Sequence, residues 1–200
     1  MSRLTAQHWV FDMDGTLTRA IHDFDLMRRT MKVPDDIDIL TYLNNLPSEE
    51  AEPLFQWLRE YEHGLAERAQ AAEGIYALLS QLRARGVTLG LLTRNMTPLA
   101  RLTLERAGLA EFFPDHVLLG RDDAEPKPDP DGLNRLASQW GTTPSSLVMV
   151  GDSIIDVLTG QAAGAYTVLI HSDEDEAQGL ADLCVGTAAE LSAHLDRCSA

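Results

Sequence analysis

The sequence predicts an α/β fold built on a doubly wound parallel sheet, for three reasons. Short apolar runs alternate along the chain with longer segments whose apolar residues recur at helical spacing. These runs are nonpolar at almost every position, as expected of strands that helices cover on both faces. One segment, residues 19–72, has no strand pattern and interrupts the alternation directly after the first strand. We therefore expect a parallel sheet with a small helical insert at that point.

Five apolar runs are expected to form the strands of the sheet. They cover residues 8–11, 87–92, 117–119, 147–150 and 165–170. The helices between them are expected near residues 74–85, 97–108, 129–141 and 153–163. A last helix should follow the capping-box sequence Thr187-x-x-Glu190. Thr97 is expected as an N-cap with Pro98 at the first helical position, and Gly164 is expected to end its helix.

Apolar residues at helical spacing predict three helices inside the insert. Residues 24–31 fit a short first helix, and residues 37–43 fit a second. The third is longer and extends to about residue 65. We expect it to start near Pro53, because proline is tolerated in the first turn of a helix.

The length and composition fit one globular domain with a modest insertion. The chain has 200 residues, of which 44% are hydrophobic and 24% are charged. We expect residues 1–18 and 73–200 to form the core and residues 19–72 to form the helical insert. The acidic run at residues 173–176 is expected to be a solvated loop.

The net charge and the cysteines of the sequence indicate which partners and which compartment to expect. A net charge of −15 argues against a nucleic acid or an anionic membrane as partner. No apolar run approaches the roughly 18 residues of a membrane span, and the N-terminal stretch lacks the apolar segment of a signal peptide. Cys184 and Cys198 show no metal-ligand spacing, so we expect a reduced, cytoplasmic protein. An anionic substrate would need a local positive site, and Lys32 and Lys127 are the only lysines.

Reactive side chains follow four of the expected strands at the point where each strand ends. They are Asp12 and Asp14 after the first strand, Thr93, Arg94 and Asn95 after the second, Lys127 in the loop after the third, and Asp152 and Asp156 after the fourth. In parallel sheets the carboxyl ends of the strands meet at one edge, which is where ligands bind. The sequence therefore predicts one site that contains all of these residues.

These residue types suit the chemistry of a phosphate ester. Carboxylates that converge on one point repel each other unless a cation relieves them, and Mg²⁺ prefers oxygen ligands. Asp12, Asp14, Asp152 and Asp156 are the candidate metal-binding residues. With such a cation bound, a negative site can accept a phosphate dianion.

Each remaining role follows from what phosphoryl transfer needs. Asp12 is the candidate nucleophile, and Asp14 the candidate acid that protonates the leaving alkoxide and then takes a proton from water. Thr93, with Arg94 and Asn95 at the start of the next helix, is expected to hold phosphate oxygens. Lys127 is expected to neutralise charge on the nucleophile and the phosphoryl group.

Each of these residues also has a purely structural interpretation. The Asp12–Asp14 pair fits an acidic turn, and Thr93 fits the end of a strand. Lys127 fits a rigid loop between two prolines. Asp152 or Asp156 fits the start of a helix. Because such residues follow four successive strands, a shared functional site explains them better than four independent structural roles.

Four motifs resemble those of the haloacid dehalogenase-like hydrolase superfamily, in its order and spacing. They are Phe11-Asp12-Met13-Asp14-Gly15-Thr16-Leu17, Leu91-Leu92-Thr93, Lys127-Pro128-Asp129-Pro130 and Val150-Gly151-Asp152-Ser153-x-x-Asp156. The stretch from Glu73 to about Ile170 is similar to the phosphoglycolate-phosphatase-like branch. The resemblance implies a Rossmann-like core, a helical cap in residues 19–72, and Mg²⁺-dependent phosphoryl transfer through an aspartyl-phosphate. It also implies that Asp14 binds Mg²⁺ through its backbone carbonyl.

The resemblance makes a phosphatase the first expectation for the function. The substrate would be a small phosphorylated metabolite, and the protein a monomer or a homodimer. Arg19, Arg28 and Arg29 of the cap are candidates for binding a second anionic group on the substrate, against a role in surface solubility.

Other activities remain as alternatives at this point. They are a sugar-phosphate mutase, a phosphonatase that would use Lys32, a dehalogenase, and a phosphate-binding module without turnover. Dehalogenases of the superfamily lack the second acid of the first motif, so Asp14 favours phosphate chemistry. The sequence contains neither G-x-x-x-x-G-K-[ST] nor G-x-G-x-x-G, which disfavours those nucleotide-binding classes.

Overall fold

The computed structural model describes residues 3–171 and 175–198, which form a six-stranded parallel sheet with helices on both faces. The strand order is β3-β2-β1-β4-β5-β6, and every pair of neighbours is parallel. The strands are β1 (His8–Phe11), β2 (Thr88–Leu92), β3 (Leu118–Leu119), β4 (Leu147–Gly151), β5 (Tyr166–Ile170) and β6 (Leu183–Val185). The predicted fold class is confirmed.

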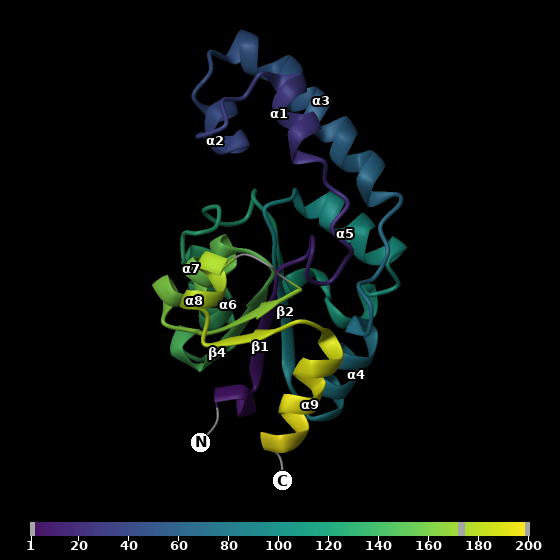
Figure 1. Cartoon of the computed structure of the whole chain (residues 1–200), viewed down its shortest axis with the longest axis vertical. Helices are drawn as coiled ribbons and strands as arrows, with labels where there is room; N and C mark the ends of the chain where they lie inside the picture. The colour runs from purple at the N-terminus through teal and green to yellow at the C-terminus, as the bar shows by residue number, and fades with distance from the viewer. Residues whose placement is uncertain (1–2, 172–174, 199–200) are drawn as a thin grey trace.

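The helices occupy the two faces of the sheet and the insert (Figure 1). They are α1 (Phe24–Met31), α2 (Ile39–Asn44), α3 (Ser48–Ala66), α4 (Ile75–Ala84), α5 (Thr97–Arg106), α6 (Asp131–Gln139), α7 (Ile154–Ala163), α8 (Asp175–Leu180) and α9 (Ala188–Cys198). The described residues also form four short 3₁₀ helices, η1 (Arg3–Thr5), η2 (Ala110–Phe112), η3 (Asp115–Val117) and η4 (Pro144–Ser146). In the described residues, none of the helices combines the length and the hydropathy that crossing a membrane requires.

Alternating side chains of β1 face two separate apolar cores. Trp9 and Phe11 lie in the larger cluster, which includes side chains of α4, α5 and α9. Val10 points to the opposite face, into a cluster with residues of α6 such as Leu133 and Leu136. All three β1 side chains are fully buried. The strand is therefore apolar at successive positions because helices cover both of its faces.

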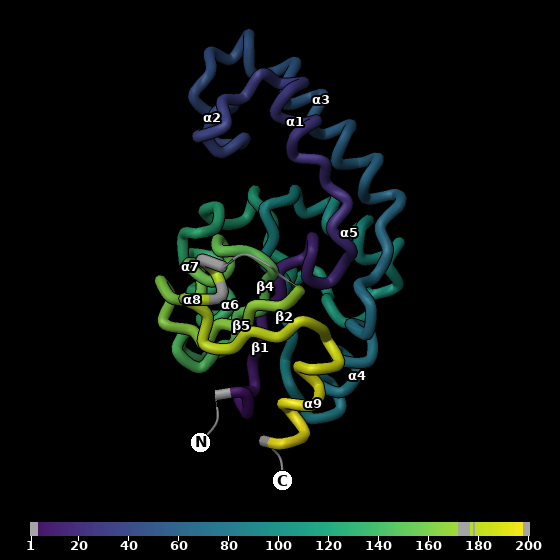
Figure 2. The backbone as a smooth tube through the Cα atoms, viewed as in Figure 1, coloured from purple at the N-terminus to yellow at the C-terminus, as the bar shows by residue number. Residues whose placement is uncertain are grey.

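The insert packs around an apolar cluster of its own. Met27 and Met31 of α1, Ile39 and Leu43 of α2, and Leu58 of α3 are buried together in it. In Figure 2 the insert rises from one end of the core, while η1 and α9 lie at the opposite end. Hydrogen bonds from Arg19 to Gln70 and from Ala72 to Leu17 join the two connecting segments at the base of the insert.

Three details of the predicted elements are wrong. Helix α3 begins at Ser48 rather than near Pro53, so the proline lies inside the helix. Met96 is the N-cap of α5, which makes Thr97 its first residue. The sheet has a sixth strand, β6, which the sequence analysis missed because it is short and lies at the edge.

The acidic run and the last predicted helix both lie in the C-terminal part of the chain. Of the acidic run at 173–176, residues 173 and 174 lie outside the described residues, and Asp175 begins α8 instead of continuing a loop. At α9 the Thr187 hydroxyl accepts the N–H of Glu190, as a capping box requires. The Glu190 carboxylate instead accepts the N–H of Gly186.

Candidate active site

The residues predicted to form a site meet at the carboxyl ends of β1, β2 and β4. From β1 the chain moves to β2 and β3 on one side, and it later crosses to β4, β5 and β6 on the other. The site therefore lies where the strand order reverses, the usual position for ligands in such sheets. A cavity of about 550 Å³ opens there, and residues of α1, α2 and α3 line its far side.

Sheet hydrogen bonds fix the first residues beyond β1 and β2. The N–H of Asp12 donates to the carbonyl of Val150 at 2.8 Å, and that of Thr93 donates to Leu119 at 3.0 Å. Both side chains are buried and line the cavity. The rigid sheet therefore determines where the two predicted groups lie.

Lys127 joins two of the predicted carboxylates. Its Nζ donates to Asp12 Oδ1 at 2.5 Å and to Asp156 Oδ1 at 2.6 Å, and only 3% of its side chain is exposed. Burial acts to lower the pKa of Lys127, but the two carboxylates outweigh burial and leave the pKa raised. The lysine therefore stays charged and provides the local positive charge that the sequence analysis requires.

Asp12, Asp152 and Asp156 form a cluster that fits a hard cation. One carboxylate oxygen from each lies within 4.8 Å of the others. Burial and, after it, the nearby charges of Asp12 and Asp156 together raise the pKa of Asp152 to about 8, although Lys127 acts to lower it. A divalent cation with oxygen ligands would relieve this repulsion, so the donor set suits such an ion.

Two glycines allow this cluster to form. Gly15 has a φ of +89°, and a Cβ there would lie 2.0 Å from Asp152 Oδ2. A Cβ on Gly151, the last residue of β4, would lie 2.2 Å from the Asp156 Cβ. Side chains at these positions would displace the carboxylates, so the glycines belong to the site geometry.

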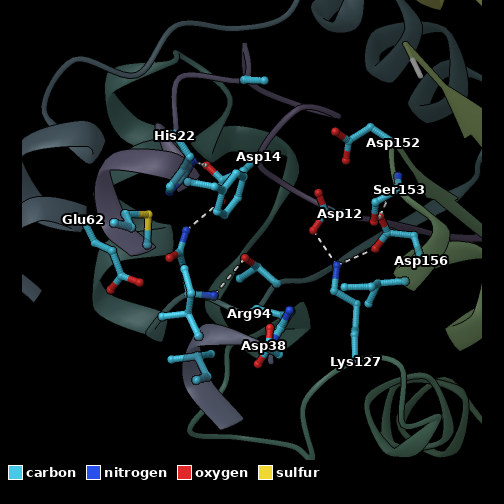
Figure 3. Close-up of a pocket in the computed structure, with 18 of the residues that line it drawn as sticks. Asp12, Asp14, His22, Asp38, Glu62, Arg94, Lys127, Asp152, Ser153 and Asp156 are labelled. Atoms are coloured by element: carbon cyan, nitrogen blue, oxygen red, sulfur yellow. Dashed lines mark hydrogen bonds and ion pairs between the residues drawn. The ribbon is translucent and has the colours of Figure 1, made fainter. Parts of the chain in front are cut away.

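Asp14 lies on another side of the cavity, away from Lys127 (Figure 3). Asn95 Nδ2 donates to Asp14 Oδ2 at 2.7 Å, and His22 Nδ1 lies 3.8 Å from Oδ1. Burial raises the pKa of Asp14 to about 7. The Asn95 N–H in turn donates to Thr93 Oγ1 at 3.1 Å, which ties the loop after β2 together.

The cavity contains all the predicted site residues. These are Asp12, Asp14, Thr93, Arg94, Asn95, Lys127, Asp152 and Asp156. Of the cap cations, Arg28 also lines the cavity. Arg19, Arg29 and Lys32 are exposed and are not among its lining residues in the described part of the chain.

Four further polar residues of the lining were not predicted from the sequence as functional. They are His22, Asp38, Glu62 and Ser153. Asp38 accepts from Arg94 Nη2 at 2.7 Å. Glu62 of α3 pairs with Arg121 through two hydrogen bonds of 3.1 Å each. Ser153 has a local signal, because it caps α7 through a capping box with Asp156, but the other three depend on how the insert folds over the core.

The fold and the cluster of two buried carboxylates and one half-buried carboxylate suit an α/β enzyme with a metal ion, and comparison with known proteins identifies its family. Residues 7–164 match the model of the haloacid dehalogenase-like hydrolase family. The chain belongs to this family and is therefore a hydrolase, as the four sequence motifs predict.

Three similar proteins show the closeness of the match. An N-acetylmuramic acid 6-phosphate phosphatase from Pseudomonas aeruginosa is 30% identical over 98% of both chains. A phosphoglycolate phosphatase from Salmonella typhi is 34% identical over 78% of this chain and 60% of its own length. A crystallised hydrolase from Pseudomonas syringae has a TM-score of 0.78 at 21% identity, covering 96% of this chain and 98% of that one. The relatives thus include phosphatases, and the solved structure shares the fold.

Proposed function

We propose that this protein is a Mg²⁺-dependent phosphatase that hydrolyses the phosphate monoester of a small metabolite through an aspartyl-phosphate. The observation that carries the proposal is the position of Lys127 Nζ, within hydrogen-bond reach of both Asp12 and Asp156 in the buried end of the cavity. The phosphatase names of two relatives support the same reaction class.

Asp12 acts as the nucleophile and Asp14 transfers the protons. Asp12 attacks phosphorus, and the bond between phosphorus and the alcohol oxygen breaks as Asp14 gives that oxygen its proton. Water then attacks the phosphorus of the aspartyl-phosphate while Asp14 takes back a proton, and inorganic phosphate leaves. Lys127 stabilises negative charge on Asp12 and on the transferred group. Thr93 and the backbone N–H groups of Arg94 and Asn95, ahead of α5, hold phosphate oxygens, while the side chains of Arg94 and Asn95 stay with Asp38 and Asp14.

We propose that Asp12, Asp152 and the backbone carbonyl of Asp14 hold Mg²⁺, with Asp156 binding it directly or through water. When bound, the ion supplies positive charge that lets a phosphate dianion enter a site lined by carboxylates. Residues 19–72 act as a cap over the core of residues 1–18 and 73–200. The cap side of the cavity, lined by side chains such as Phe24, Met27 and Leu58, would contact the alcohol part of the substrate.

The proposal is tested with an aryl phosphate as substrate. The purified protein should hydrolyse it in the presence of Mg²⁺, and EDTA should abolish the activity until Mg²⁺ is restored. Asp12→Asn should lower kcat by about four orders of magnitude or more, because it removes the nucleophile. Asp35→Asn, at an exposed residue outside the cavity lining, makes the same change of charge and should keep full activity. Substantial turnover by Asp12→Asn would refute the covalent mechanism.

A further inference from the structure

We propose that the alcohol part of the substrate is uncharged and carries hydroxyl groups, and that the site discriminates against monoesters with a second anionic group. This inference rests on the proposed phosphatase function and names the substrate class of the same site. It replaces the expectation that cap arginines bind a second anion, and three features of the cavity support it.

The first feature is that each permanently charged base in the cavity lining already has partners. Lys127 is held by two carboxylates, as described above. Arg94 Nη2 donates to Asp38 Oδ1 at 2.7 Å. Arg28 Nη1 donates to the carbonyls of Pro34 and Ile37 at 2.7 and 2.8 Å, which fixes the loop between α1 and α2. The charge of Arg94 is thus paired with Asp38, although its buried Nε has no hydrogen-bond partner among the described residues, and a second anion on the substrate would have to compete with Asp38 for it.

The second feature is the charge balance of the cavity. Six carboxylates face three permanently charged bases among the lining residues: Asp12, Asp14, Asp38, Glu62, Asp152 and Asp156 against Arg28, Arg94 and Lys127. The positive charges of a divalent ion and of Lys127 would both offset the negative charge of the phosphoryl group. Glu62 is neutralised from behind by Arg121, which is not a lining residue. With that ion and Arg121 counted, the six carboxylates are balanced, so a bound phosphate dianion already gives the site a net negative charge that repels an additional anion on the alcohol.

The third feature is the supply of acceptors away from the phosphate-binding end. Figure 3 shows Glu62 on the opposite side of the pocket from Lys127 and Asp156, with Asp38 and Arg94 between them near one edge. Burial acts to raise the pKa of Asp38, but hydrogen bonds from Arg94 and Thr41 outweigh it and lower the pKa, so the group stays an ionised acceptor. Among the described contacts, all three hydrogen bonds to Asp38 end on Oδ1, which leaves Oδ2 for a substrate hydroxyl.

Apolar side chains complete the surface that the alcohol would meet. Phe24, Met27, Ile39, Leu40 and Leu58 line the cap side of the cavity beside these acceptors. A polyol or sugar has hydroxyls that donate to carboxylates and C–H faces that pack on apolar groups, so it suits both kinds of surface. A carboxylate has no hydrogen to donate to Asp38 or Glu62.

The first experiment compares substrates that differ only in CH₂OH against COO⁻. Glycerol 3-phosphate is paired with 3-phosphoglycerate, and sorbitol 6-phosphate with 6-phosphogluconate. We expect kcat/KM to be about tenfold or more higher for the neutral member of each pair, since an unpaired charge in such a site is strongly disfavoured. Equal or better turnover of the anionic members would overturn the inference and leave the phosphatase proposal standing. No turnover of these or of the aryl phosphate would overturn both.

The second experiment frees Arg94 by the substitution Asp38→Asn. Asparagine keeps the oxygen that caps α2, so the helix should be retained, but it removes the charge that pairs with Arg94. We expect the ratio of kcat/KM for the anionic over the neutral member to rise about fivefold or more. Asp36→Asn makes the same change of charge two residues away at an exposed position outside the cavity lining, and it should leave the ratio unchanged. Equal shifts in both variants, or none in Asp38→Asn, would contradict the role of the Arg94–Asp38 pair.

Discussion

The Asn95 side chain donates to Asp14 Oδ2 at 2.7 Å, so it is placed to orient the proposed acid. We expect Asn95→Ala to lower kcat about tenfold on alkyl phosphates with little change in KM, because a misoriented acid protonates poor leaving groups less well. Aryl phosphates need less protonation and should lose less. The measurement is kcat and KM on one alkyl and one aryl phosphate, with Asp14→Asn as the reference for complete loss of the acid.

Asn95→Asp provides the matched control for the hydrogen bond. It keeps the shape of the side chain but places a carboxylate against Asp14, so its loss on alkyl phosphates should exceed that of the alanine variant. The competing role is direct binding of phosphate by the Asn95 side chain. That role predicts a rise in KM for alkyl and aryl phosphates alike, which would rule out action through Asp14.

The residues that the sequence could predict are those that follow strand ends. Asp12, Thr93 and Asp152 each come directly after an apolar run, and the sheet alone brings them together. Asp38 and Glu62 could not be found in this way. Their position in the cavity depends on how α2 and α3 pack over the core, and an isolated acid on a helix looks the same whether it faces solvent or a site. The role of the Asn95 side chain depends likewise on a contact 81 residues apart in sequence.

At the scale of elements, α3 contains a proline in its interior. Pro53 is the sixth residue of the helix and is exposed, and it has no N–H to donate to the carbonyl four residues earlier. We expect Pro53→Ala to raise the free energy of unfolding by about 1–2 kcal/mol, which is the gain in helix propensity less the entropy that proline removes from the unfolded chain. Denaturant unfolding measures this change.

Gln56→Ala is the control for Pro53→Ala. Gln56 is exposed on the same helix, and its replacement leaves the backbone hydrogen bonds intact, so stability should change by less than about 0.5 kcal/mol. A loss of stability in Pro53→Ala would show that the ring contributes packing or rigidity that outweighs the missing donor.

The boundaries of α3 and β6 show why element ends are hard to predict. Proline is tolerated in the first turn of a helix, so the sequence predicted a start of α3 near Pro53, but the helix has more than one turn before it, where Ala51 is buried. Strand β6 has three residues, Leu183, Cys184 and Val185, and within the described part of the chain it pairs with β5 alone. An edge strand this short is too short to show the hydrophobic periodicity of a strand in the sequence. It is recognised in the structure by its pairing with β5.

At the scale of the whole molecule, ion pairs join the insert to the core. Arg94 of the loop after β2 pairs with Asp38 of the insert, and Arg121, which follows β3, pairs with Glu62 of α3. The second pair is mostly buried, with 13% of Arg121 and 8% of Glu62 exposed. In a chain of net charge −15, these arginines form ion pairs with acidic residues of the protein itself. The net negative charge of the sequence implied that an anionic substrate needs a local positive site. It did not indicate that acids of the protein itself would neutralise most of the basic side chains near that site.

The Glu62–Arg121 pair leads to a prediction about the stability of the whole molecule. Arg121→Ala leaves Glu62 buried without its partner and should lower the free energy of unfolding by about 3 kcal/mol at neutral pH. Burial already raises the pKa of Glu62 despite Arg121 and His22, and Asp122 raises it further. Without Arg121 the folded-state pKa rises again above that of the unfolded chain. The deficit of the variant should therefore be small near the unfolded pKa of about 4.3 and should grow as the pH rises.

A double variant separates the buried charge from lost packing. Glu62→Gln combined with Arg121→Ala removes the unpaired charge, so it should recover a large part of the stability lost in Arg121→Ala and should lose the pH dependence. Denaturant unfolding of the wild type, both single variants and the double variant at about pH 5 and about pH 8 measures the coupling. A deficit of the same size at both pH values would mean that Arg121 stabilises the junction by packing alone. A deficit that grows with pH would instead assign the stability of the junction to charge, because only an ionised Glu62 needs Arg121 to remain buried between insert and core.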